Sequence, residues 1–188
     1  KSIDSSKRKF EMLYSASGCM ESFSGESDMI RFGLTERNIR IALFMAAMCG
    51  GEWMNVCERM TDRFVAECIA SDGFIYTVYD RKNKTACTDA DGNYLRAMTE
   101  AAYDVLCAYR MFRKHGINKP SWLEKDRRFM DFLIRVQNVD GSWFQAYHED
   151  GSEAEVRPVH RHRMEVVEGM KKAGTAVPLA FTAQMVRM

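Results

Sequence analysis

Carboxylate and aromatic side chains are interleaved in two segments of the sequence, FIYTVYD at residues 74–80 and WFQAYHED at residues 143–150. Carboxylates donate and accept protons, and a pair of them flanking a bond is the usual equipment for acid/base hydrolysis. Aromatic rings offer flat apolar platforms to cyclic ligands. The mixture favours a binding or catalytic site over an ordinary solvated loop.

A saccharide matches these segments, because its ring faces are apolar and its rim carries hydroxyls. The candidate catalytic carboxylates, among which the pattern does not choose, are Asp80, Glu149 and Asp150. The candidate substrate-binding residues are Tyr76, Tyr79, Arg96, Trp143, Tyr147 and His160. Of these, Trp143 and Tyr147 are expected to form a sugar platform, although packing of both rings onto helix ends explains them equally well.

Other polar residues near these segments have a simpler structural explanation. The pairs Asp72-Gly73 and Asp140-Gly141 suit the end of a helix, where glycine supplies a positive φ. Glu36 and Glu100 each follow a threonine and fit a capping box at the start of a helix better than a catalytic role.

The histidines and cysteines do not form a recognisable metal site. His148, His160 and His162 fall in one long segment, which is conceivable for metal or acid/base chemistry but more typical of a solvated basic stretch. The six cysteines show no CxxC spacing and are expected to be free thiols. We predict no metal, no cofactor and, from the thiols, a cytoplasmic location.

Length and charge limit the kinds of partner. The 188 residues are 46% hydrophobic and fit a single domain over 1–188. Because 27 basic residues balance 26 acidic ones, no electrostatic footprint for nucleic acid or an anionic membrane is present. No apolar run is long enough to span a membrane. A sugar or another small neutral substrate stays open as the partner.

The candidate residues must be positioned by helices. Apolar residues recur at helical spacing in four segments, at residues 34–49, 53–70, 94–116 and 121–138. Short breaks join the first to the second and the third to the fourth, which predicts two helical hairpins. Pro120 suits the start of the last helix, and Ser121 is its candidate cap.

The two hairpins are copies of one repeat. At an offset of 68 residues Asp72 aligns with Asp140 and Tyr79 with Tyr147, so we divide the chain into repeats at about 34–93, 94–173 and an incomplete 174–188. Helix pairs repeated in this way stack into open or circular arrays. The long return loops then gather on one side, with short β-like segments near 74–79 and 142–147.

Helix pairs joined by Asp-Gly-aromatic loops resemble the six-hairpin, or (α/α)6-toroid, glycosidase superfamily. The resemblance rests on FMDFLIRVQNVDGSW and on GTAVPLAFTAQM, which begins a new helix. It implies an all-α fold forming part of a toroid, and a glycoside hydrolase that cleaves oligo- or polysaccharide by carboxylate acid/base catalysis. At most about half of a ring is covered, so the remainder comes from a missing part of the same toroid or from a homo-oligomer partner.

Two alternatives remain open at the level of sequence. Gln137, Gly141 and Trp143 also resemble the Gln-x-x-x-Gly-x-Trp motif of terpene cyclases, which are α/α toroids too, but the acidic DxDD and DDxxD clusters of those enzymes do not occur. The other alternative is a noncatalytic helical-repeat scaffold that binds a partner through its loops.

Overall fold

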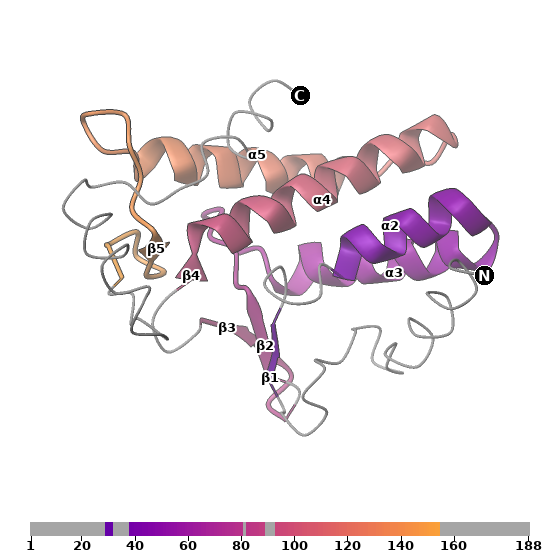
Figure 1. Ribbon diagram of the computed structural model, residues 1–188, viewed down its shortest axis with the longest axis horizontal. Coiled ribbons are helices and arrows are strands. Elements are labelled where there is room, and N and C mark those ends of the chain that lie inside the picture. Colours follow the sequence, from indigo (N-terminus) through magenta and orange to yellow (C-terminus); the bar gives the residue numbers. More distant parts are fainter. Residues whose placement is uncertain (1–28, 32–37, 81, 89–92, 155–188) are drawn as a thin grey trace, which may run out of the picture.

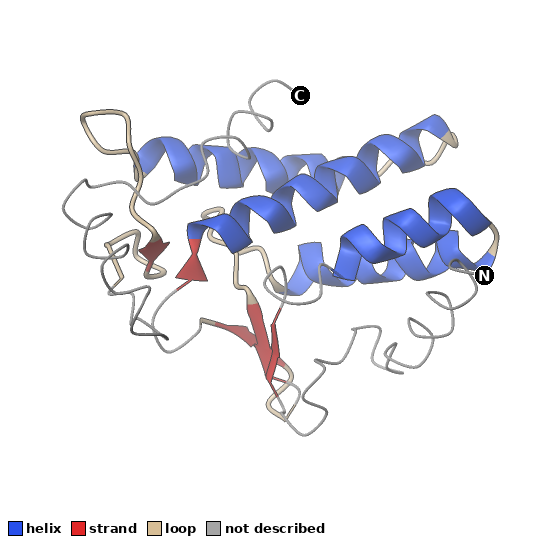
Figure 2. Cartoon of the chain, in the orientation of Figure 1, coloured by secondary structure: helices blue, strands red, loops and turns tan. Residues whose placement is uncertain are grey.

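The computed structural model describes residues 29–31, 38–80, 82–88 and 93–154 of the chain (Figure 1). Its elements follow in the order β1 (Met29–Arg31), α2 (Asn38–Cys49), α3 (Glu52–Glu67), β2 (Val78–Asp80), β3 (Thr85–Cys87), β4 (Asn93–Tyr94), α4 (Leu95–Lys114), α5 (Pro120–Arg135) and β5 (Ala146–Tyr147). The all-α prediction is confirmed, because helices dominate and the strands are short (Figure 2).

The four helices form the two expected hairpins. Helix α2 packs on α3 and helix α4 on α5, while α2 also contacts α4 and α3 contacts α5. The hairpins therefore stack side by side, with α2 and α4 as their first helices and α3 and α5 as their return helices. The strands lie together at the end of the stack where α4 begins (Figure 1).

The helix starts differ from the sequence prediction in detail. Helix α4 follows Tyr94 with no side-chain cap, so the capping box proposed for Glu100 is wrong. The Glu100 carboxylate lies instead in the interior, and the residue is 1% exposed. Lys119 precedes α5 and Pro120 occupies its first turn, so Ser121 is not the cap, because proline already fixes the helical φ there.

A single hydrophobic cluster runs through both hairpins. Its largest fully buried side chains include Trp122, Phe112, Phe129 and Phe132, all from the second hairpin. The Trp122 ring meets Phe112 edge-to-face at 5.3 Å between centroids. The indole N–H of Trp122 donates to Asp62 Oδ1 at 2.8 Å, which satisfies its one donor and ties α5 to α3.

The strands form two small antiparallel sheets. One has the order β1-β2-β3, with Ile30 opposite Tyr79 and Tyr79 opposite Ala86. The other pairs β4 with β5. Strands β2 and β5 begin 68 residues apart, in agreement with the repeat, but several residues later than the β-like segments predicted at 74–79 and 142–147.

No helix in the described part of the chain is both long and apolar enough to cross a membrane. Within the described ranges Cys49, Cys57 and Cys107 carry free thiols.

Candidate functional site

The two return loops converge at the start of α4. We call residues 68–80 the first loop and residues 136–154 the second loop. They are joined through Asn93, which is completely buried and makes two hydrogen bonds to the first loop: its Nδ2 donates to Ile75 O at 2.7 Å, and its Oδ1 accepts from Thr77 Oγ1 at 3.1 Å. Asn93 also pairs with Tyr147 of the second loop in the β4–β5 ladder.

A direct contact between the loops brings a candidate catalytic carboxylate to a candidate binder. The Tyr76 hydroxyl donates to Glu149 Oε1, although the residues are 73 positions apart in sequence. Tyr76 is partly exposed and Glu149 is exposed, so the pair is accessible from solvent. Desolvation, followed by the hydrogen bond and the charge of Glu149, raises the pKa of Tyr76 above its usual range. The phenol therefore stays protonated and remains a donor to the carboxylate.

A chain of aromatic rings in contact with one another begins at Tyr76 and supports the Tyr76–Glu149 contact. Its members, joined edge-to-face by centroid distances of 5.3, 5.6, 5.9 and 6.1 Å, are in order Tyr76, Phe74, Phe132, Tyr147 and Phe144. Phe132 is the central ring and comes from α5, so the return helix of the second hairpin holds both loops. Edge-to-face pairs prefer one relative orientation, which fixes the geometry of the loops.

The other two candidate carboxylates hold turns. Asp80 Oδ1 accepts the backbone N–H groups of Lys82 and Asn83 at 2.9 and 3.1 Å. Asp150 Oδ1 accepts the N–H and the hydroxyl of Ser152 at 2.9 and 2.6 Å. These hydrogen bonds lower the pKa of both carboxyls, with Asn83 the largest cause for Asp80 and Ser152 for Asp150. Asp80 is partly exposed and Asp150 is exposed, and both carboxylates suit turn stabilisation.

The predicted aromatic platform is less exposed than the sequence suggested. Tyr147 is completely buried, and its hydroxyl accepts the N–H of Phe144 at 2.8 Å. Trp143 is half-buried, and its indole N–H donates to Leu133 O at 2.8 Å. Tyr79 is 3% exposed and lies beneath the guanidinium of Arg63, 4.7 Å from the ring centroid. These rings pack the loops onto α3 and α5.

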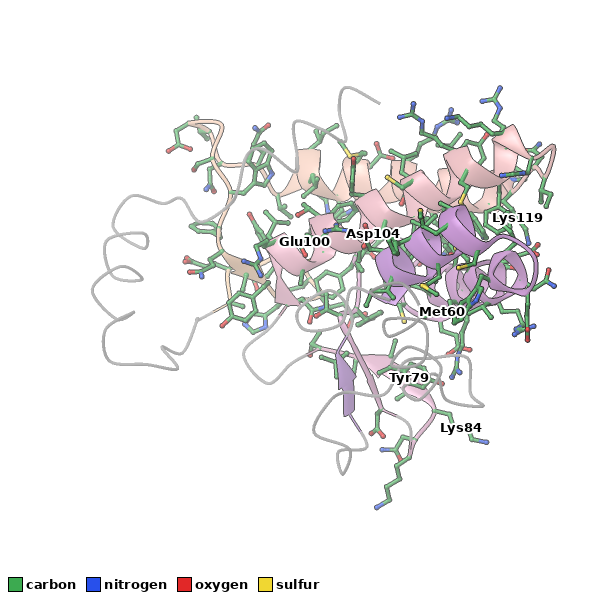
Figure 3. All side chains as sticks on the ribbon, turned by 45° about the vertical axis from the view of Figure 1, so that its right-hand side comes forward. Met60, Tyr79, Lys84, Glu100, Asp104 and Lys119 are labelled. Carbon is green, nitrogen blue, oxygen red and sulfur yellow. The ribbon has the colours of Figure 1, made fainter. Side chains whose placement is uncertain are left out.

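Arg96 lies in the first turn of α4, beside the loops. Its side chain is half exposed, and Nε is 3.7 Å from Glu100 Oε1, one turn along the helix. Figure 3 shows Glu100 and Asp104 on successive turns of α4, with Asp104 next to α2. The start of α4, which faces the loops, thus carries an exposed cation, Arg96, next to a buried carboxylate, Glu100.

His160 lies outside the described residues, as do His162 and Glu36. Within the described ranges no three His, Cys, Asp or Glu side chains are grouped closely enough to hold a metal ion. A groove of about 460 Å³ lies away from the loops and contains none of the candidate residues; its lining is Tyr109, Asn118, Pro120, Ser121, Leu123, Glu124 and Arg127.

Sequence reasoning missed two residues of this region. Asn93 joins both loops to β4, and no motif marks it, because only the folded chain brings residues 75, 77 and 147 to its side. Asp126 of α5 is 3% exposed, and neither carboxylate oxygen has a hydrogen-bond partner. The sequence does carry a signal for the burial of Asp126, because this residue lies on the apolar stripe of the helix between Trp122 and Phe129.

No family profile matches the sequence, and no curated protein matches it. Solved structures do. The crystal structure of unsaturated glucuronyl hydrolase from Bacillus sp. GL1, responsible for the degradation of glycosaminoglycan, matches with a TM-score of 0.60 and 14% identity, over 90% of this chain and 52% of that chain. An aspartate-to-asparagine variant named UGL, with dGlcA-Glc-Rha-Glc, matches with a TM-score of 0.59 and the same identity and coverage.

At this identity the similarity is one of fold. The chain has the fold of part of a six-hairpin α/α toroid, which confirms the resemblance found in the sequence. It spans about half the length of the structures it matches.

Proposed function

We propose that this chain is part of a carbohydrate-active enzyme, a glycoside hydrolase, whose site lies where the first and second loops meet at the start of α4. The observation that carries the proposal is the Tyr76–Glu149 contact, because it unites a solvent-accessible carboxylate and an aromatic hydroxyl from two different repeats. The toroid fold supports it, since the solved structures of this fold that match include a glycosaminoglycan-degrading hydrolase.

Glu149 is the acid/base carboxylate in this proposal. A general base must be ionised and held in one orientation, and the protonated Tyr76 hydroxyl supplies a fixed donor to one carboxylate oxygen. The other oxygen is left to take a proton from water or to share one with a glycosidic oxygen. Tyr76 is then the positioning residue of the pair and a polar contact for the saccharide.

The remaining candidates receive supporting roles. Asp80 and Asp150 hold turns, so we assign neither of them the proton transfer. Arg96, which is half exposed, is the proposed polar contact to sugar hydroxyls, and the exposed edge of Trp143 is the proposed platform. Tyr147 and Tyr79 fix the loops from the interior.

Glycoside cleavage requires a second carboxylate across the scissile bond. Since the chain spans about half the length of the toroids it matches, we propose that the opposing carboxylate comes from the rest of the ring. The 188-residue chain alone is therefore expected to bind saccharide weakly and not to cleave it.

The test is a titration of the full-length polypeptide, and of the 188-residue chain, against a panel of oligosaccharides that includes neutral and acidic sugars. Tyr76→Phe removes only the hydroxyl that holds Glu149, so we expect the dissociation constant of the best ligand to rise by roughly tenfold, equivalent to one hydrogen bond to a charged group. Tyr109→Phe, in the remote groove, is the matched control and should bind as the parent does.

Full-length protein that binds no member of the panel contradicts the proposed function. Saccharide binding that is equally strong in the parent and in Tyr76→Phe contradicts the site assignment alone. The first outcome shifts weight to a helical-repeat scaffold that binds a different partner.

A further inference from the structure

The chain makes the same five-residue turn at the end of each return helix. In the first turn, residues 70–74, the N–H of Ala70 donates to Phe74 O at 2.9 Å and that of Gly73 to Ala70 O at 3.2 Å. The second turn, residues 138–142, closes with the two equivalent bonds, each of 2.9 Å. The glycine φ values are 94° for the first turn and 84° for the second, so the backbones correspond.

The first turn is covered by the return helix of the next hairpin. Lys125 of α5 donates to Ile69 O at 2.6 Å, and Arg128, three residues later, donates to Ser71 O at 2.9 Å. The helix backbone lies directly on Gly73, where an added Cβ would be 2.0 Å from Arg128 O. Gly73 is buried as a result.

The second turn has no such cover in the described part of the chain. Gly141 is exposed, and an added Cβ there would meet nothing closer than Gln137 Nε2 at 3.9 Å. Val139, the counterpart of Ser71, is 109% exposed. The same backbone shape is therefore buried at one position and open at the other.

We propose that the second turn is the docking site for the return helix of a third hairpin in the same polypeptide. The occupant is specified by the first turn: an α-helix that brings its backbone onto Gly141 and carries two Lys or Arg residues three positions apart. These would donate to the carbonyl oxygens of Gln137 and Val139, the counterparts of Ile69 and Ser71. The longer toroids that this chain matches, of which it spans 52%, provide the room for such a hairpin.

Two chain lengths and two glycines test the proposal. The lengths are the 188-residue chain and the full-length polypeptide, and the variants are Gly141→Ala and the control Gly116→Ala. Gly116 also has a positive φ, of 79°, and open space at its Cβ position. In the 188-residue chain both variants should lower the melting temperature by a similar few degrees, because each forces alanine into the left-handed region.

In the full-length polypeptide Gly141→Ala should lower the melting temperature by at least ~5 °C more than Gly116→Ala does. The reason is that the Cβ of alanine at position 141 would meet the backbone of the docked return helix. Hydrogen exchange gives a second measurement: amides of residues 138–142 should become as protected as those of residues 70–74, which serve as the internal reference. Equal costs for the two variants in the full-length polypeptide, unchanged exchange at the second turn, or a gene that encodes no helix pair after this repeat would overturn the proposal.

Discussion

Arg40 of α2 and Asp104 of α4 bind each other across the two hairpins. Arg40 Nε donates to Asp104 Oδ1 at 2.8 Å, across 64 residues of sequence. The Asp104 side chain is 5% exposed and the Arg40 side chain 32%. The pair joins α2 to α4, so a charge on one copy of the repeat neutralises a buried charge on the next and fixes the spacing of the first helices.

Removing Arg40 should therefore be costly. We expect Arg40→Ala to lower the free energy of unfolding by about 2 kcal/mol, because it leaves Asp104 buried without this cation; the partial exposure of Arg40 keeps the loss below that of a fully buried pair. The control is Glu124→Ala, which breaks the exposed Glu124–Arg128 pair at 3.2 Å and should cost less than about 0.5 kcal/mol. Urea unfolding measures both, and losses of equal size would refute the role of the pair.

Gly73 should be the least replaceable glycine among the described residues. Gly73→Ala combines an unfavourable φ with a contact of 2.0 Å to the backbone of α5, so we expect a loss of at least about 3 kcal/mol. Gly116→Ala has the unfavourable φ without the contact and should cost about 1–2 kcal/mol. Thermal unfolding of the two variants side by side decides the matter, and a Gly73→Ala protein as stable as Gly116→Ala would show that α5 does not rest on the first turn.

Asp126 should make the fold less stable as the pH rises. Burial raises its pKa well above the usual range, so the folded state prefers the protonated acid. This contribution is fully present below the unfolded pKa of about 3.9 and is lost as the pH climbs through the folded value. Asp126→Leu removes the unpartnered carboxyl and should stabilise the protein by about 1–2 kcal/mol at neutral pH.

The measurement is the difference in unfolding free energy between the parent and Asp126→Leu from pH 4 to pH 8. We expect the advantage of the leucine variant to grow with pH. A difference that is constant, or that shrinks, would mean that Asp126 is ionised and solvated in the folded protein.

The repeat and the helices were predictable because they follow from local patterns. Apolar spacing placed all four helices to within a few residues, and the alignment of Asp72 with Asp140 corresponds to turns of the same backbone shape. Helix ends were less predictable: Thr99 and Glu100 were expected at the start of a helix, yet α4 begins at Leu95, because the β4–β5 pairing already sets the chain direction there.

The site was predictable only in its location. Sequence placed Tyr76 and Glu149 in loops expected to converge, but their contact depends on Phe132 and Asn93, which belong to other elements. The sequence left Tyr147 open between a sugar platform and packing onto the helix ends, and its ring is buried because it completes the aromatic chain over α5. Burial of this kind depends on contacts between distant segments, which alternation along one strand does not encode.

The most direct test of the carbohydrate-active site is the release of reducing ends from an oligosaccharide panel by the full-length polypeptide and by its Glu149→Gln variant. Glu153→Gln, four residues away in the same loop and also exposed, is the matched control. If Glu149 transfers the proton, Glu149→Gln should lower kcat by roughly 10²-fold or more while Glu153→Gln leaves it unchanged. Equal activity in the parent and both variants, or no reducing ends released from any saccharide, would contradict the account.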